Sequence, residues 1–118
     1  MSANNMKPPY YILVNDTDRT EPKFYHETHY GRVQYEGTYG DFSYETALFS
    51  HGEIYHVGPR RMHYIETALK FRDKISKIKN LPKSSLKIVK VDRTLKQTFA
   101  KIKKGQLKEI EFEGGIYA

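Results

Sequence analysis

Cysteine is absent from this chain of 118 residues. That absence excludes disulfides, thiolate zinc sites, iron–sulfur clusters and cysteine nucleophiles together. It also fits a reducing compartment, so we expect a cytoplasmic protein. Long apolar runs are missing as well, because the purest run, residues 10–14, is far shorter than the roughly 18 to 20 residues that a membrane span requires. We therefore predict no membrane partner.

The familiar glycine-rich and nucleophile motifs are also missing. The sequence contains no G-x-x-x-x-G-K-[ST], no G-x-G-x-x-G and no G-x-S-x-G. These motifs form phosphate-binding loops and dinucleotide-binding turns, or contain a serine nucleophile. Their absence leaves no positive sign of a cofactor, and we predict none. The first nine residues, M-S-A-N-N-M-K-P-P, have no apolar segment after the charge, which argues against a signal peptide and predicts a disordered lead-in.

One stretch, H-E-T-H-Y-G-R-V, raises the question of a metal site, because His26, Glu27 and His29 lie close together. A helical zinc pair needs histidines four residues apart, as in H-E-x-x-H. Here the histidines are three apart, and the surrounding residues alternate as in a strand, which places them on opposite faces. The pattern therefore predicts no metal ion.

Acid–base chemistry without a metal stays open, although we favour a protein that is not an enzyme. Cleavage of RNA needs a base, an acid and a cation near the phosphate. The residues that fit those roles are His26 or His29 with Glu27, Arg32, Tyr35, His56 and Arg60. Their spacing neither supports nor excludes such a site.

Alternation and composition divide the chain into short elements. Strands are predicted over residues 10–14, 23–30, 32–39, 53–57, 86–91 and 107–112, with a hairpin turn at Gly31. Residues 44–51 fit either a short helix capped by Ser43 or a strand. Two helices are predicted: one opens at Gly58-Pro59 and runs to Asn80, and one follows the capping box of Thr94 and Gln97 and stops at Gly105.

This order of elements predicts an α+β fold. We expect a single small domain over residues 10–113, a lead-in over 1–9 and a flexible tail over 114–118. Its mixed or mainly antiparallel sheet carries two helices packed on one face. Residues 53–91 would form a β–α–β unit, right-handed if its strands are parallel.

Helical spacing also predicts the core. In the first helix the apolar stripe consists of Ile65, Ala68 or Leu69, the stem of Arg72, Ile75 and Ile78. In the second helix the buried residues are expected to be Leu95, Phe99 and Ile102.

Charge is distributed very unevenly. Residues 70–104 contain 13 Lys or Arg and two acidic residues, Asp73 and Asp92, so this segment carries +11, whereas the rest of the chain carries −5. Such an asymmetry is typical of a protein that meets an anionic partner.

Nucleic acid, either DNA or RNA, is the partner that we favour. Lysine greatly outnumbers arginine in the basic segment, which favours phosphate contact over base readout, and tyrosines on a sheet can stack bases. Arg60 and Arg61 are expected in the first turn of the long helix, where cations are unfavourable unless an anion or Glu53 lies nearby. The candidate binding residues are Arg60, Arg61, Lys70, Lys74, Lys77, Lys87, Lys90, Lys96, Lys101, Lys103, Lys104, Tyr35 and Tyr39.

The alternative is a protein-binding accessory or inhibitor that docks on an acidic protein surface. A short, cysteine-free chain rich in tyrosine and lysine, with no catalytic signature, has the style of small viral accessory proteins. Tyrosine and arginine are also enriched where interfaces concentrate their binding energy. The oligomeric state does not follow from the sequence.

Overall fold

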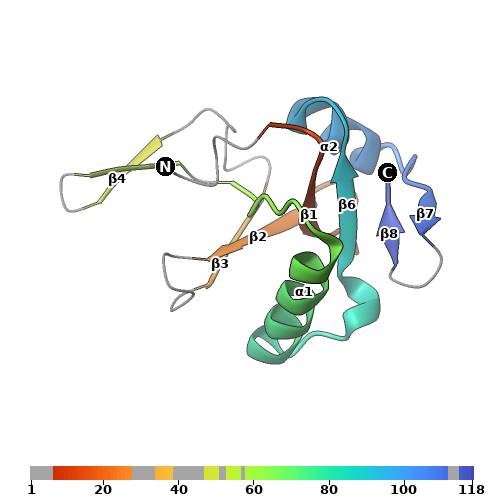
Figure 1. Cartoon of the computed structure of the whole chain (residues 1–118), viewed down its shortest axis with the longest axis horizontal. Coiled ribbons are helices and arrows are strands. Elements are labelled where there is room, and N and C mark those ends of the chain that lie inside the picture. Colours follow the sequence, from red (N-terminus) through yellow and green to blue (C-terminus); the bar gives the residue numbers. More distant parts are fainter. Residues whose placement is uncertain (1–6, 28–33, 39–46, 51–52, 57, 112–114) are drawn as a thin grey trace.

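A six-stranded mixed sheet forms the centre of the molecule, with strand order β3-β2-β1-β6-β8-β7 (Figure 1). The computed structural model describes residues 7–27, 34–38, 47–50, 53–56, 58–111 and 115–118. The strands of this sheet are β1 (Tyr10–Asn15), β2 (Lys23–Glu27), β3 (Gln34–Thr38), β6 (Lys87–Val91), β7 (Glu109–Glu111) and β8 (Ile116–Tyr117). Together with two helices, α1 (Ile65–Lys79) and α2 (Leu95–Lys103), they confirm the predicted α+β class.

The hairpin predicted on either side of Gly31 is present in its described part. β2 and β3 are antiparallel, with Phe24 opposite Gly37 and His26 opposite Tyr35. A Cβ on Gly37 would lie 2.8 Å from the ring of Phe24, so this position is restricted to glycine by the aromatic ring across the strand. The turn itself lies outside the described residues.

The two helices cover opposite faces of the sheet, not one face as predicted. Alternate residues of β1 divide between two cores: Ile12 packs in the cluster that contains Phe99 of α2, and Leu13 packs in the cluster that contains Phe71 of α1. Figure 1 accordingly shows β1 and β6 between the two helices. The reason is the continuous apolarity of β1, because a strand that is apolar on both faces needs cover on both.

Helix α1 begins later than predicted, at Ile65 rather than near Pro59. The preceding residues are extended: Met62 exchanges two backbone hydrogen bonds with Tyr11, of 2.7 and 2.9 Å, and the Arg60 N–H donates to the Tyr25 carbonyl. This segment, residues 60–62, is thus hydrogen-bonded to β1 at Met62 and to β2 at Arg60. Tertiary backbone pairing overrides the helix-start signal of Gly58-Pro59.

The buried face of α1 consists of Ala68, Phe71 and Ile75. Ile75 and Ala68 were predicted, whereas Phe71 was missed. The predicted Ile78 is 50% exposed, and Leu69 packs only partly against the core. Asn80, in the left-handed conformation, ends the helix.

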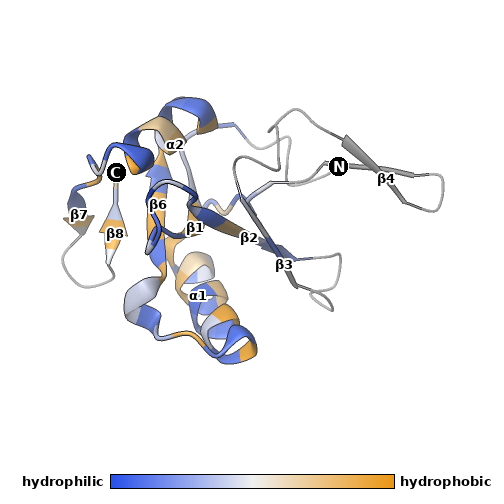
Figure 2. Ribbon diagram, turned by 180° about the vertical axis from the view of Figure 1, so that it is seen from behind, coloured by the Kyte–Doolittle hydropathy of each residue, from blue (hydrophilic) through white to orange (hydrophobic). Residues whose placement is uncertain are grey.

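Helix α2 forms as predicted. The Thr94 hydroxyl accepts a hydrogen bond from the Gln97 backbone N–H at 3.1 Å, which is the capping half of the predicted box. Leu95, Phe99 and Ile102 are buried, and Thr98 joins them. Figure 2 shows the resulting contrast between an apolar inner side and hydrophilic outer side of this helix.

Two further predictions fail around the sheet. β5 (Glu53–His56) pairs with β4 (Ala47–Ser50) in a separate two-stranded sheet, so residues 53–91 do not form a β–α–β unit. The parallel neighbours are instead β6 and β8, connected through α2 and β7. The predicted flexible tail therefore contributes β8, and Ile116 is buried in the α1 core. Residues 1–6 of the predicted lead-in lie outside the described residues.

Candidate functional site

Two cations on the α1 side of the sheet share one carboxylate, that of Glu27. Glu27, only 12% exposed, receives Arg60 at 2.8 Å and Lys74 at 2.9 Å. The Arg60 guanidinium also lies 4.9 Å from the centre of the Phe71 ring. These two basic side chains, both predicted to bind nucleic acid, are therefore used within the fold.

Other predicted cations have internal partners as well. Lys87 contacts Asp16 at 2.8 Å and lies over the ring of Tyr117. Arg61 lies 5.0 Å from the centre of the Tyr10 ring. Arg60 and Arg61 belong to the extended segment before α1, so the expected conflict with a helix dipole does not arise. Lys70 and Lys77 are exposed on α1.

Asp73 illustrates how the outer side of α1 is neutralised. Its carboxylate lies 2.9 Å from Lys83, in the short helix η3 (Lys83–Ser85). The hydrogen bond from Lys83 is the largest cause that lowers the pKa of Asp73 below its ordinary value, with further help from the charges of Lys83, Arg72 and Lys77. The α1 side therefore presents mixed charge rather than a uniform basic face.

Helix α2 presents a different surface, which we call the α2 basic surface. Residues 93–104 contain five cations and no carboxylate. The side chains of α2 that are buried face the sheet, so its lysines are exposed on the outer side. At the far end of the helix the guanidinium of Arg19 lies against Gly105. The members of the surface are Arg93, Lys96, Lys101, Lys103 and Lys104.

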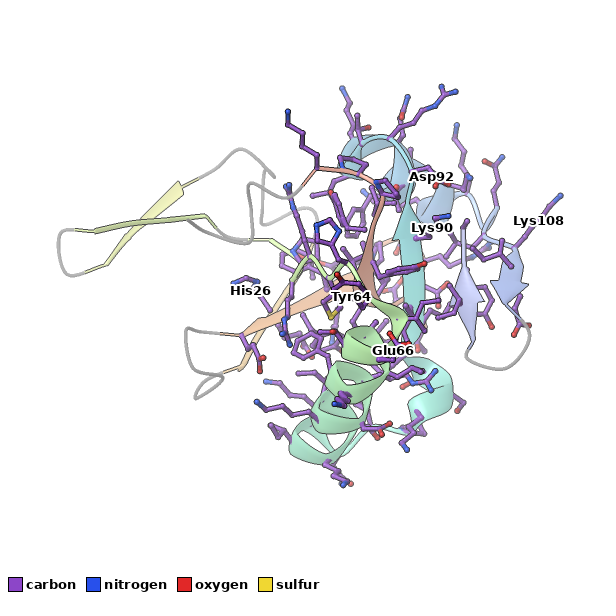
Figure 3. The ribbon with its side chains drawn as sticks, in the orientation of Figure 1. His26, Tyr64, Glu66, Lys90, Asp92 and Lys108 are labelled. Atoms are coloured by element: carbon purple, nitrogen blue, oxygen red, sulfur yellow. The ribbon has the colours of Figure 1, made fainter. Side chains whose placement is uncertain are left out.

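A cleft of about 390 Å³ opens where β6 ends and α2 begins. Three cations line it: Lys90 from the end of β6, Arg93 from the following turn and Lys101 from α2. The lining is completed by Asp92, Thr94, Gln97, Thr98 and Ala118. Lys90 and Asp92 lie next to each other at this end of the sheet, with a nitrogen–oxygen distance of 3.8 Å (Figure 3).

The predicted binding residues are thus split into two sets. Because the helices lie on opposite faces, the lysines of α1 and those of α2 do not join into one surface. Tyr35 lies in β3, but its side chain is not among those that the structure describes. Tyr39 lies outside the described residues. Arg93 and Asp92, which also line the cleft, were not predicted as binding residues. The signal that points to them is their position directly before the capping box of α2.

The histidine-rich stretch does not form a metal cluster in the described part of the chain. His26 and Glu27 point to opposite faces of β2, and His29 lies outside the described residues. No group of three or more potential ligands occurs among the residues that the structure describes. Burial, with the charge of Arg60, lowers the pKa of His26 below its ordinary value of 6.5, against an opposing effect of Glu27.

Comparison with known proteins does not add an assignment. No family model matches the chain, and neither a curated protein nor a solved structure matches it. Within the described residues, neither α1 nor α2 has the length and apolarity needed to cross a bilayer.

Proposed function

We propose that the protein binds nucleic acid through phosphate contacts made by the α2 basic surface, with low sequence specificity. The observation that carries the proposal is the contrast between the two sides of the sheet. On the α1 side, Glu27 and Asp73 neutralise nearby cations. On the α2 side, residues 93–104 carry five cations and no carboxylate.

The size of the surface suits a short run of phosphates. A helix of nine residues is about 13 Å long. Phosphates follow one another about every 3.4 Å along one strand of a duplex. The α2 basic surface therefore spans about four phosphates. Four of its lysines are exposed: Lys96, Lys101, Lys103 and Lys104.

Lysine chemistry accounts for the low specificity. Four of the five cations are lysines, whose compact ammonium groups meet phosphates as point charges. Bidentate recognition of base edges requires arginine or amide side chains in a groove. The binding energy then comes mainly from counterion release, which is the same for every sequence.

The test is a salt titration of binding to oligonucleotides of unrelated sequence. For about four phosphate contacts, the slope of log affinity against log salt should be near −3 to −4 on duplex DNA and shallower on single strands. Replacing Lys96, Lys101 and Lys104 together with glutamine should flatten that slope by about two to three units and weaken binding to all sequences alike.

The matched control replaces three lysines of α1, namely Lys70, Lys77 and Lys79, with glutamine. It removes the same charge from the opposite face, so a steep slope should remain. If both triple variants lose affinity equally, binding reflects net charge alone and the α2 basic surface is not the site. If the protein shows no binding even near about 50 mM salt, the proposal is wrong and an acidic protein surface becomes the partner to test.

A further inference from the structure

We infer that the protein forms a dimer through the two-stranded sheet of β4 and β5, which we call the β4–β5 arm. The arm comprises residues 47–50 and 53–56 and is separate from the six-stranded sheet. Figure 1 shows it at one side of the molecule, apart from α1 and α2. An isolated pair of strands is at best marginally stable in water and needs further strands or a helix packed against it. The arm therefore requires a partner to be stable.

Both faces of the arm carry an apolar pair of residues. Leu48 is opposite Tyr55, and Phe49 is opposite Ile54. Because neighbouring residues of a strand alternate between faces, these two pairs lie on opposite faces of the arm. Within the described residues, β4 and β5 pair only with each other. Each strand therefore has an outer edge at which another strand can be added.

The outer edge of β4 is the one suited to such an addition. The four residues Ala47–Ser50 carry no charge and include no proline, whereas β5 contains Glu53 and His56. Charged residues and proline are usual means by which edge strands avoid pairing with another chain. β4 lacks both, so we expect the additional strand at β4.

A second copy of the chain fits this edge. Two β4 strands that pair antiparallel across a two-fold axis form one four-stranded sheet and a closed dimer. Cross-strand neighbours share a face of the sheet, so the residue that lies opposite itself at the axis is either Leu48 or Phe49. In both registers an apolar residue meets its own copy, and no like charges lie opposite each other along β4.

The distribution of charge also favours contact between two arms. The chain carries +6, so two copies repel each other, most of all through their α2 basic surfaces. No Lys or Arg occurs between residues 33 and 59, and the arm contains one acidic residue, Glu53. Contact through the arms joins nearly uncharged segments and keeps the two copies of α2 apart.

Dimer formation does not depend on nucleic acid, so it is measured in its absence. Sedimentation of the full chain over about 1 to 200 μM should show a monomer–dimer equilibrium. Phe49→Lys places two like charges at or beside the two-fold axis and should raise the dissociation constant of the dimer at least about tenfold. Ile54→Lys is the matched control, because it puts the same charge opposite Phe49 but on β5, away from the axis. It should raise the dissociation constant by less than about threefold.

A charge exchange tests the pairing directly. Phe49→Lys and Phe49→Glu should each form a weak homodimer, whereas a mixture of the two should form a heterodimer at least about tenfold more tightly, since opposite charges then meet across the axis. A mixture of Ile54→Lys and Ile54→Glu should show no such preference. Thermal unfolding of each variant verifies that the six-stranded sheet and its helices are folded.

Three results would overturn the inference. A chain that stays monomeric throughout the concentration range has no dimer to explain. A dimer that Phe49→Lys leaves unchanged forms through another surface. Equal weakening by Phe49→Lys and Ile54→Lys, with no heterodimer preference at Phe49, excludes pairing at the edge of β4.

Discussion

Glu27 of β2 and Arg60, which are 33 residues apart in the sequence, form an ion pair of 2.8 Å. The second oxygen of the same carboxylate accepts a hydrogen bond from Lys74 of α1 at 2.9 Å. Glu27 thereby joins β2, the extended segment before α1, and α1 itself. This one carboxylate engages two of the predicted binding cations within the fold.

The first prediction concerns the stability that this carboxylate provides. Glu27→Gln leaves two partly buried cations without their anionic partner, so the free energy of unfolding should fall by about 1 to 3 kcal/mol. Denaturant unfolding measures the loss. Asp73→Asn is the matched control, since its pair with Lys83 is exposed and should matter less. An equal loss at both positions would show that the Glu27 pairs gain nothing from burial.

The second prediction tests which face of α1 is buried. Phe71→Ala and Ile75→Ala remove fully buried side chains and should each cost about 2 to 5 kcal/mol. Ile78→Ala, at a position that is 50% exposed, should change stability by less than about 0.5 kcal/mol. Urea unfolding of the three variants decides the matter. A large loss at Ile78 with a small one at Phe71 would mean that the helix is rotated from the position described.

The third prediction concerns pH and His26. The Nδ1 atom of His26 is buried and has no hydrogen-bond partner among the described residues. Burial is the main cause that lowers the pKa of His26 in the folded protein, so the unfolded chain binds this proton more readily. Stability should therefore fall as the pH drops from about 6.5 towards the lower pKa of the folded state.

The measurement is urea unfolding at several pH values between about 7.5 and 5, combined with an NMR titration of the imidazole. His26→Gln removes the proton-binding group, and it should flatten the decline within this interval. His63→Gln is the matched control, because His63 is exposed. If His26→Gln leaves the pH dependence unchanged, another group causes it.

Several elements could be predicted because their signals are local. The capping box fixed the start of α2, since Thr94 and Gln97 satisfy the helix end wherever it packs. The alternation over 23–39 indicated β2 and β3, and the apolar run at Tyr10 indicated a central strand. The concentration of charge between residues 70 and 104 also required no structure. Each of these depends on neighbours within a few residues.

Other features could not be predicted, because they depend on pairing between distant segments. Residues 60–62 are extended because Tyr11 supplies backbone hydrogen bonds to Met62. Ile116 and Tyr117 become a strand because the edge of β6 is open to them. In both cases the local signals, Gly58-Pro59 and Gly114-Gly115, predicted something else, since sequence spacing carries no record of which edge a segment will reach.

By itself, the sequence determined the class of fold, the second helix with its cap, and the basic character of residues 70–104. Only the tertiary structure decided where that charge is displayed. It placed the two helices on opposite faces of the sheet, engaged Arg60 and Lys74 with Glu27, and left Lys96, Lys101 and Lys103 exposed on the outer side of α2. The physical reason is that charge is a property of each residue, whereas its neutralisation or exposure depends on the partners that folding brings within a few ångströms.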